Sequence, residues 1–492
     1  MNPAIALPAT VLLPLAASAL IAAAHRRPNL REAVTLLTGV ALLALVLSQL
    51  EDVLNGARPA VILLETLPGL AIEFEIEPLG MLFALVASFL WIVTSLYSIG
   101  YMRGHHEQNQ TRFYSFFAVA ISGAMGIAFA GNLLTLFIFY ELLTLSTYPL
   151  VTHARTEQAR EGGRVYLGYL LGSSVAFLLL ALVWTWWLTG TLEFRYGGIL
   201  DGVVSPAIAG ALLALYIFGI DKAAVMPIHR WLPAAMVAPT PVSALLHAVA
   251  VVKAGVFTVL KVAVYIFGLD YLASIPATQW LLYVAAATIL IASLVALKQD
   301  NLKLRLAYST ISQLSYVVMG ALLATPQAAI GGGIHIAAHA FAKITLFFCA
   351  GAILVSTHKT DISQMRGIGR HMPLTMIAFT IGALSMIALP LTAGFISKWY
   401  LLLGAIDAQQ MAIVGVIVIS TLLNAGYFMP IVYAAFFEAP DDASPRLWTG
   451  RYGEAPLPML LAIGVTTIGT LALFFYADVP LALAQHMIAG QP

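Results

Sequence analysis

The sequence has few charged residues and almost no cysteine. Only 10% of its 492 residues are Asp, Glu, Lys or Arg, whereas 61% are hydrophobic. A soluble domain carries about 25% charged residues, so a cytosolic enzyme is excluded. The net charge of +1 and the lack of a basic cluster also exclude a nucleic-acid-binding protein. Because Cys349 is the one cysteine, we expect neither a disulfide framework nor an iron–sulfur cluster held by this chain alone.

The motifs of nucleotide-binding and zinc proteins are absent as well. We find no Walker phosphate loop, no dinucleotide fingerprint after a strand and no Cys/His spacing typical of zinc. The run Gly331-Gly332-Gly333 is not followed by Lys-Ser/Thr, so it indicates close packing or a loop and not phosphate binding. We therefore expect no cofactor and no resident metal.

Most of the sequence consists of apolar runs. Each is about 20 residues long, as a membrane-spanning helix requires. The first run lacks a basic leader, so we expect a retained helix and not a cleaved signal. The pattern predicts an all-α polytopic membrane protein with about 14 transmembrane helices. The predicted starts lie near Pro3, Glu32, Pro78, Arg112, Asn132, Arg164, Ala207, Pro241, Gln279, Arg305, Ala329, Met372, Met411 and Leu457.

The basic residues of the loops gather on one side of this predicted topology. The even-numbered loops contain only Arg58 and Arg195, and the loop after the second span is rich in glutamate. The positive-inside rule therefore predicts both termini on the outer face of a cell membrane, for which we expect the bacterial inner membrane. The odd-numbered loops contain the other 17: Arg26, Arg27, Arg31, Arg103, Arg112, Arg155, Arg160, Arg164, Arg230, Lys298, Lys303, Arg305, Lys359, Arg366, Arg370, Arg446 and Arg451.

Five lysines and two acids remain inside or at the edges of the apolar runs. They are Lys222, Lys253, Lys261, Lys343, Lys398, Glu141 and Asp221. A charge inside the membrane costs at least about 2.5–3.5 kcal/mol, so several in one chain favour a polar pathway through the bundle. The alternative is that lysines near helix ends snorkel to the interface, for which Lys261 is the best candidate. A desolvated lysine can lose its proton whereas arginine cannot, which favours proton transfer over static anion binding.

Histidines and lysine share one face of a later span. His335, His339 and Lys343 follow each other at four-residue intervals, which places them on one side of a helix. We interpret this face as a proton relay. Buried histidines that only satisfy hydrogen bonds, or a metal or haem site, are the alternatives. His247 lies near Lys253 in the sequence and is an auxiliary candidate, together with Asp221 and Lys261.

Gly and Pro interrupt two spans next to a lysine. Lys222 follows Gly219, and Lys398 follows Pro390 and Gly394. Broken helices at corresponding positions of two halves indicate the ion site of a transporter. Because five spans separate the two breaks, the pattern predicts two inverted five-helix repeats. We expect N-terminal helices in residues 1–111, the repeats in 112–266 and 267–438, and a last loop and helix in 439–492.

The segments that carry these charges resemble one membrane-protein family. The glutamate of YELL, the block GIDKAAVMPIHRWLPAAMVAPTPVSALLHAVAVVKAG, the helix HIAAHAFAK and the break LPLTAGFISK are similar to those of antiporter-like subunits. These subunits occur in complex I, in membrane-bound hydrogenases and in Mrp sodium/proton antiporters. The resemblance covers nearly the whole chain and implies 14 helices, breaks in helices seven and twelve, and insertion among other membrane subunits.

The resemblance also implies roles for individual residues. It matches Glu141 and Lys222 to the family's charged pair and Lys253 to its central lysine. It matches His335, His339 and Lys343 to the helix-eleven relay, Lys398 to the terminal charge and Lys261 to a basic residue in the outer half.

Three functions stay open for such a chain. A lysine at 398 and the expected lack of a long C-terminal lateral helix favour an Mrp-D-like antiporter component, with other membrane subunits as partners. The segment YELLTLSTYPLVTH departs from the expected Mrp form. It leaves room for the proton-pumping arm of a redox-driven complex, an NADH:quinone oxidoreductase or a hydrogenase. The third function is a scaffold that transports nothing. The expected substrates are protons and sodium or another monovalent cation.

Overall fold

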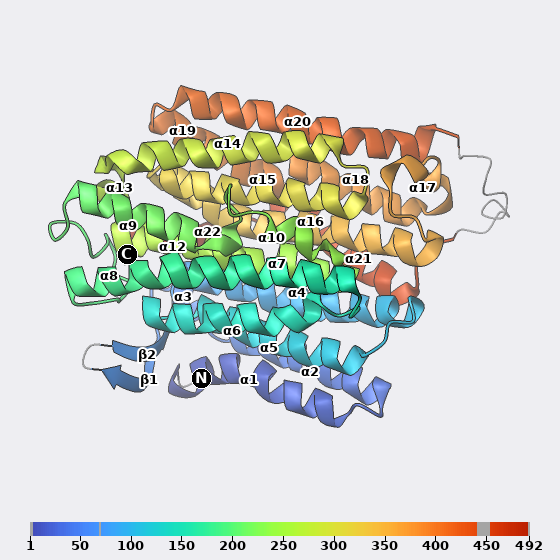
Figure 1. The fold of residues 1–492 in the computed structure, drawn as a ribbon, viewed down its shortest axis with the longest axis horizontal. Coiled ribbons are helices and arrows are strands. Elements are labelled where there is room, and N and C mark those ends of the chain that lie inside the picture. The colour runs from blue at the N-terminus through green and yellow to red at the C-terminus, as the bar shows by residue number, and fades with distance from the viewer. Residues whose placement is uncertain (1–2, 68–69, 440–452, 491–492) are drawn as a thin grey trace.

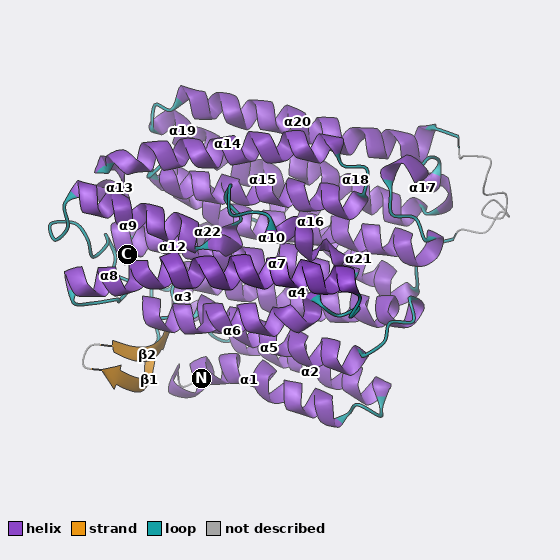
Figure 2. Cartoon of the chain, in the orientation of Figure 1, coloured by secondary structure: helices purple, strands orange, loops and turns teal. Residues whose placement is uncertain are grey.

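Long helices run side by side and make up nearly all of the molecule (Figures 1 and 2). The computed structural model describes residues 3–67, 70–439 and 453–490. Within these ranges, ten helices are long and apolar enough to cross a membrane, and two further apolar helices are shorter. The chain is thus an all-α polytopic membrane protein, as predicted, while the count of 14 spans stays a prediction.

The N-terminal part contains three long helices and a small β-hairpin. The two strands pair in antiparallel fashion, with Val61 opposite Phe74. The apolar pattern gave no sign of this hairpin, because its strands are far shorter than the spans around it. The elements are α1 (Pro3–Ala23), α2 (Pro28–Leu47), α3 (Leu50–Leu54), β1 (Ala60–Leu67), β2 (Leu70–Glu75) and α4 (Pro78–Gly104).

The middle of the chain alternates long helices with short helical pieces. Three π-helical turns adjoin α-helices: η1 joins α7 to α8, η4 follows α11, and η5 follows α12 and ends that helix before Gly268. The elements are α5 (Gln110–Ala128), α6 (Leu133–Val151), α7 (Glu157–Ser173), η1 (Ser174–Leu178), α8 (Leu179–Thr189), α9 (Pro206–Gly219), η2 (Asp221–Ala223), α10 (Trp231–Ala234), η3 (Ala235–Val237), α11 (Thr240–Ala244), η4 (Leu245–Val249), α12 (Val251–Val262) and η5 (Ala263–Phe267).

The C-terminal part is arranged around one long central helix. This helix, α16, has 32 residues and packs against α15, α18, α19 and α21. The elements are α13 (Leu269–Ser274), α14 (Pro276–Lys298), α15 (Leu302–Leu322), α16 (Pro326–Thr357), η6 (Ile362–Gln364), α17 (Ile368–His371), α18 (Pro373–Ile387), α19 (Ala393–Asp407), α20 (Met411–Phe437), α21 (Leu457–Phe475) and α22 (Asp478–Ala489).

Glycines let α16 approach its neighbours closely. Gly331 lies inside the helix, where a Cβ atom would come within 2.8 Å of the backbone nitrogen of Leu401 on α19. A side chain at this position would push the two helices apart. The glycine run is therefore a close-packing element, one of the two alternatives that the sequence left open.

Both helix breaks occur where glycine and proline predicted them. The first lies between α9, which ends at Gly219, and η2, which contains Lys222. The second lies between α18, which ends at Ile387, and α19, which begins at Ala393 and contains Lys398. Whether the two halves form inverted repeats, and whether the four predicted ranges are structural units, remain predictions.

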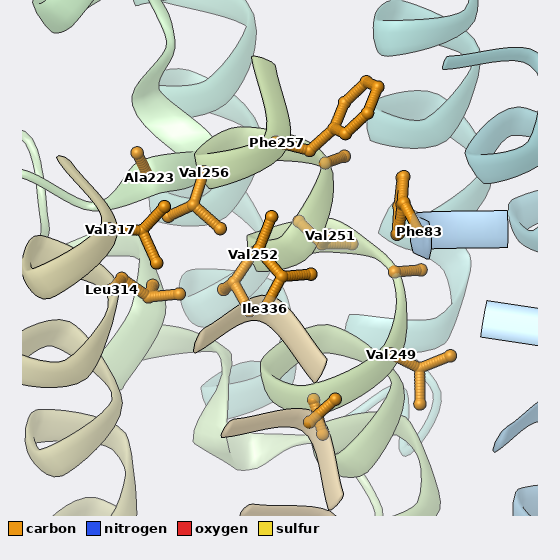
Figure 3. Packing of buried hydrophobic residues seen from close by; sticks show 14 of the residues in the cluster. Phe83, Ala223, Val249, Val251, Val252, Val256, Phe257, Leu314, Val317 and Ile336 are labelled. Atoms are coloured by element: carbon orange, nitrogen blue, oxygen red, sulfur yellow. The ribbon is translucent and has the colours of Figure 1, made fainter. Parts of the chain in front are cut away.

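An apolar core surrounds the point where α12, α15 and α16 meet. Val252 and Val256 of α12, Leu314 of α15 and Ile336 of α16 are fully or almost fully buried there (Figure 3). This packing encloses Lys253, which lies between the two valines in the sequence and is 1% exposed. The core thus isolates the lysine from lipid and bulk water.

Candidate functional site

All five lysines inside the apolar runs are buried in the bundle. None of Lys222, Lys253, Lys261, Lys343 and Lys398 is more than 5% exposed. The snorkelling prediction for Lys261 is wrong, because its ammonium group stays inside. It contacts the Glu77 carboxylate at 3.2 Å and donates a 2.8 Å hydrogen bond to the carbonyl of Ala130. A buried carboxylate provides the counter-charge that snorkelling would otherwise have found in water.

Lys222 occupies the first helix break and faces α6. Its Nζ donates a 2.6 Å hydrogen bond to the Thr144 hydroxyl and lies 3.2 Å from the centre of the Tyr140 ring. Tyr140 and Thr144 are four residues apart, so they share the face of α6 that meets the break. A hydroxyl acceptor and an aromatic face hold the amine without an ion pair to either residue.

Asp221, next to Lys222, is held by hydroxyl groups. It accepts hydrogen bonds from the Tyr140 hydroxyl at 2.8 Å and the Ser173 hydroxyl at 2.6 Å. The indole of Trp231 donates to the Asp221 backbone carbonyl at 3.0 Å, which ties the next helical piece to the break. Asp221 thus organises the first break, and its side chain is 2% exposed.

Glu141 is placed differently from its predicted partner. Its carboxylate oxygens are buried and have no hydrogen-bond partner among the described residues. No ion pair between Glu141 and Lys222 is present in that part of the chain, although the two lie within electrostatic range. The Glu141 side chain leaves α6 about 100° from that of Tyr140, and the Lys222 amine contacts Tyr140 and Thr144 instead.

Lys253 meets the histidine face of α16. Its Nζ lies 2.5 Å from Nδ1 of His339, which joins α12 to α16. The rings of His339 and His335 are stacked with centroids 5.8 Å apart. His335 Nδ1 lies 2.9 Å from the hydroxyl of Ser397, the residue before Lys398. The predicted histidine relay therefore lies between the central lysine and the second helix break.

Lys343 reaches α15 and α20, whereas Lys398 reaches α15 and α18. The Lys343 ammonium donates a 2.8 Å hydrogen bond to the Ser309 hydroxyl. The Lys398 ammonium donates a 2.9 Å hydrogen bond to the carbonyl of Met386. Lys398 also lines a groove between α19 and α20, together with Trp399 and other mainly apolar residues. Neither amine has a carboxylate in an ion pair among the described side chains.

Polar side chains without partners lie in the same region. Gln313 and Ser315 of α15 are completely buried, and their side-chain oxygen and nitrogen atoms contact no hydrogen-bonding group of the described residues. Gln313 lies one helical turn after Ser309, on the face that receives Lys343. Buried amides and hydroxyls without protein partners are usually solvated by ordered water. This region is therefore polar enough for a hydrated path.

Two candidates are less informative. His247 lies in the π-helical turn η4, and its side chain is outside the described part of the structure. No group of three His, Cys, Asp or Glu side chains that could hold a metal ion occurs within residues 3–67, 70–439 and 453–490. His335 and His339 thus lack a third ligand of these types there.

Several contact residues were not singled out from the sequence. Thr144, Ser173, Ser309, Asn424 and Tyr427 are polar residues inside apolar helices, and each bonds to a candidate residue or to a neighbour of one. Hydroxyl residues are common in membrane helices, so their presence alone carries little information. Glu77 belongs to the glutamate-rich loop after the second predicted span and was not singled out, although its place before Pro78 is typical of a helix N-cap.

Comparison with known proteins identifies the family. A family profile described as NADH:quinone oxidoreductase/Mrp antiporter, TM, matches residues 130–424. The chain belongs to this family. A second profile, NADH-Ubiquinone oxidoreductase (complex I), chain 5 N-terminus, matches residues 69–114. The family resemblance predicted from the charged segments is thus confirmed.

Individual relatives in the family differ in length from this chain. It is 34% identical to NADH-quinone oxidoreductase subunit N of Desulforudis audaxviator, covering 84% of this chain and 83% of that protein. It is 32% identical to NAD(P)H-quinone oxidoreductase chain 5 of Synechocystis, covering 67% of this chain but 49% of that protein. The A/B component of a probable K(+)/H(+) antiporter of Rhizobium meliloti is 28% identical, with 84% and 42% covered. The chain spans about half the length of the chain 5 relatives.

Two solved structures of the same fold are similar to the chain over almost its full length. One comes from the Mrp complex of Dietzia, with a TM-score of 0.89, 23% identity, and 100% of this chain and 98% of that chain covered. The other comes from an archaeal membrane-bound sulfane sulfur reductase, with a TM-score of 0.83, 23% identity, and 98% and 97% covered. At this level of identity the likeness establishes the fold.

Proposed function

We propose that this chain is the proton-translocating membrane component of a multi-subunit cation/proton antiporter of the Mrp-D-like type. The observation that supports it best is the 2.5 Å contact between Lys253 and His339. It connects the buried amine at the centre of the bundle with a histidine face that continues to the second helix break. Buried amines and imidazoles can gain or lose protons near neutral pH, as proton transport requires. A structural ion pair does not require this exchange.

Protons would pass along the buried amines and imidazoles through the middle of the bundle. The sites are Lys398, Lys343 with His335 and His339, Lys253 and Lys222, with Asp221, His247 and Lys261 as auxiliary groups. Glu141 acts as a movable counter-charge for Lys222. Its carboxylate makes no hydrogen bond to the described residues, so its approach to Lys222 breaks no existing contact. A closer carboxylate stabilises the charged amine and a receding one favours release of the proton.

The basic residues of the loops bear on where the chain lies in the cell. We infer that it lies in the bacterial inner membrane with both termini outside, because the loop arginines and lysines gather on one side. Other integral membrane subunits surround it, and the exchanged ion is sodium or another monovalent cation. The antiporter name of the Rhizobium relative and the Mrp assembly of the Dietzia structure support this assignment.

A second function is favoured by other relatives. The names of the Desulforudis and Synechocystis proteins assign them to quinone oxidoreductases. The chain would then be the membrane arm of a redox-driven pump, with flavin and iron–sulfur groups on other subunits. Flavin and iron content of the complex, purified through a tag on this chain in mild detergent, separates the two. Stoichiometric flavin and iron support the redox pump, and their absence supports the antiporter.

Transport in membrane vesicles tests whether the chain moves protons at all. Lys222→Ala or Glu141→Ala is expected to abolish proton transport while the complex still assembles. Normal transport in both variants would contradict the proposal. Unimpaired transport after the double change Lys253→Ala and Lys398→Ala would instead favour a scaffold. Lys298 on α14 is exposed and offers a matched control, because Lys298→Ala removes a lysine that is not one of the five buried lysines.

A further inference from the structure

A buried chain of hydrogen bonds connects Lys343 with Lys398 by way of α15 and α20. The Lys343 ammonium donates to the Ser309 hydroxyl at 2.8 Å, and that hydroxyl lies 3.1 Å from the hydroxyl of Tyr427. The Tyr427 hydroxyl also contacts the side-chain oxygen of Asn424. All of these side chains are buried. This hydrogen-bond chain is separate from the histidine face of α16, which reaches the second helix break through Ser397.

The hydrogen-bond chain ends at a backbone carbonyl that the second helix break leaves without its usual helical donor. The Met386 carbonyl accepts a 3.2 Å hydrogen bond from the Asn424 amide and a 2.9 Å hydrogen bond from the Lys398 ammonium. In a continuous helix this carbonyl would accept from the N–H of residue 390. Residue 390 is Pro390, which has no N–H, and the helix ends before it. The sequence of the break thus creates the acceptor that Asn424 and Lys398 share.

We propose that Ser309, Tyr427 and Asn424 are positioning residues that transmit the charge state of Lys343 to Lys398. The proposal rests on the proposed function, because it assumes that both lysines gain and lose protons during transport. No proton crosses the Asn424 amide. What passes along the chain is the direction in which each hydroxyl points.

The single hydroxyl proton of Tyr427 gives the chain two arrangements. A charged Lys343 can only donate, so Ser309 accepts from it and turns its own proton to Tyr427, which then donates to Asn424. A neutral Lys343 has a lone pair and accepts from Ser309, so Tyr427 donates to Ser309 instead. Asn424 loses its donor in this second arrangement.

Each arrangement has a consequence at the shared carbonyl. When Asn424 accepts from Tyr427, its amide becomes a stronger donor to the Met386 carbonyl, since hydrogen bonds in a chain polarise one another. It then competes with the Lys398 ammonium for the same oxygen. A proton on Lys343 therefore disfavours a proton on Lys398, so the two sites alternate.

Among the described residues, the titratable groups at the two ends of this hydrogen-bond chain are Lys343 and Lys398. The Arg305 guanidinium donates a 3.0 Å hydrogen bond to the backbone carbonyl of Tyr427, and arginine keeps its charge throughout. The Phe428 ring lies 5.7 Å from the Lys343 amine and does not titrate. The Tyr316 ring lies 4.8 Å from the Lys398 amine. On the other side, Lys253 of α12 contacts His339 of α16, and His335 of α16 contacts Ser397 of α19, so Lys253 and His335 belong to the histidine route.

Proton transport by the intact complex in vesicles, measured over a range of pH, tests the proposal. Tyr427→Phe is expected to lower the rate about tenfold, the effect of one lost hydrogen bond to a chain that ends on charged groups. The pH of half-maximal transport should also change. Ser309→Ala should have the same two effects, and Ser309→Thr, which keeps a hydroxyl, should restore both. Tyr433→Phe is the control, because Tyr433 lies on the same helix and is 59% exposed.

The double variant Ser309→Ala/Tyr427→Phe tests whether the two residues act in one hydrogen-bond chain or through two independent contacts. In one chain the second change should add almost nothing to the first, whereas independent effects would multiply. An unchanged rate and pH profile in Tyr427→Phe, or multiplied effects, would overturn the proposal. If Tyr427→Phe prevents assembly, the Ser309→Ala and Ser309→Thr pair decides alone. Normal transport by Lys398→Ala in the same vesicles would instead overturn the proposed function, whatever the result for Tyr427.

Discussion

The amine of Lys253 and Nδ1 of His339 lie 2.5 Å apart, which makes them a direct polar contact between α12 and the central helix α16. Both side chains are at most 2% exposed. A lysine and a histidine at this distance share one hydrogen, so charging both at once is unfavourable. The pair is therefore suited to hold one proton that can reside on either nitrogen.

Replacing Lys253 by arginine tests whether this site needs only a positive charge or a proton that it can release. Lys253→Arg keeps the positive charge, but arginine does not release its proton, so we expect transport to fall as far as in Lys253→Ala. Proton transport in vesicles measures the effect, with the amount of assembled complex as the reference. Transport at the normal rate in Lys253→Arg would mean that the site contributes only a fixed charge.

The two acids near the first break should respond to mutation in opposite ways. Asp221→Ala leaves the Tyr140 hydroxyl without its acceptor and leaves the Ser173 hydroxyl with the Tyr169 carbonyl alone, so we expect a loss of about 1–3 kcal/mol in folding stability. Glu141→Gln removes a carboxylate with no hydrogen bond to the described residues, so we expect stability to be unchanged and transport to be lost. Thermal unfolding in detergent and vesicle transport measure the two effects. A stability loss as large in Glu141→Gln as in Asp221→Ala would contradict this division.

The sequence predicted the fold class and the family because both depend on local patterns. Apolar runs of spanning length and glycine or proline beside Lys222 and Lys398 are visible without a structure, and the helix breaks lie where they were expected. The burial of Lys261 could not be predicted in this way. It depends on Glu77, which is 184 residues earlier in the chain and reaches the lysine only through tertiary packing.

The same limit applies to the candidate site. Four-residue spacing places His335, His339 and Lys343 on one helix face, but it does not tell which helices face them. Ser309 and Tyr427 contact this region from α15 and α20, and their hydroxyls are ordinary components of membrane helices. Glu141 was paired with Lys222 by resemblance, whereas the direction of its side chain depends on the rotation of α6 in the bundle.

Acidic residues of the hairpin should make stability depend on pH. Burial raises the pKa of Glu75 above its ordinary value of 4.5, and nearby Arg58 opposes this shift only in part. The folded state therefore favours protonated Glu75, and this contribution is present at low pH and lost as pH rises through the raised pKa. We expect Glu75→Gln to stabilise the protein at neutral pH and to flatten the stability curve above the ordinary carboxyl pKa of 4.5.

Thermal unfolding at several pH values checks the expectation for Glu75. Glu65→Gln is the matched control, because Glu65 lies at an exposed position of β1 and its loss removes one charge from the same hairpin. An equal change of the curve in both variants would assign the effect to net charge and not to the burial of Glu75.

The ion pair between Lys261 and Glu77 should matter for stability through the cost of breaking it. Both side chains are at most 2% exposed, and Glu77 also caps α4 by accepting from the backbone N–H groups of Leu79 and Gly80. Lys261→Met leaves a buried carboxylate without its counter-charge, which costs about 3–5 kcal/mol. Adding Glu77→Gln removes that charge and keeps a side-chain oxygen for the cap. The double variant should therefore unfold at a higher temperature than Lys261→Met alone. A double variant that is less stable than Lys261→Met alone would contradict this expectation, because it would mean that the Glu77 carboxylate stabilises the fold through the cap even without its counter-charge.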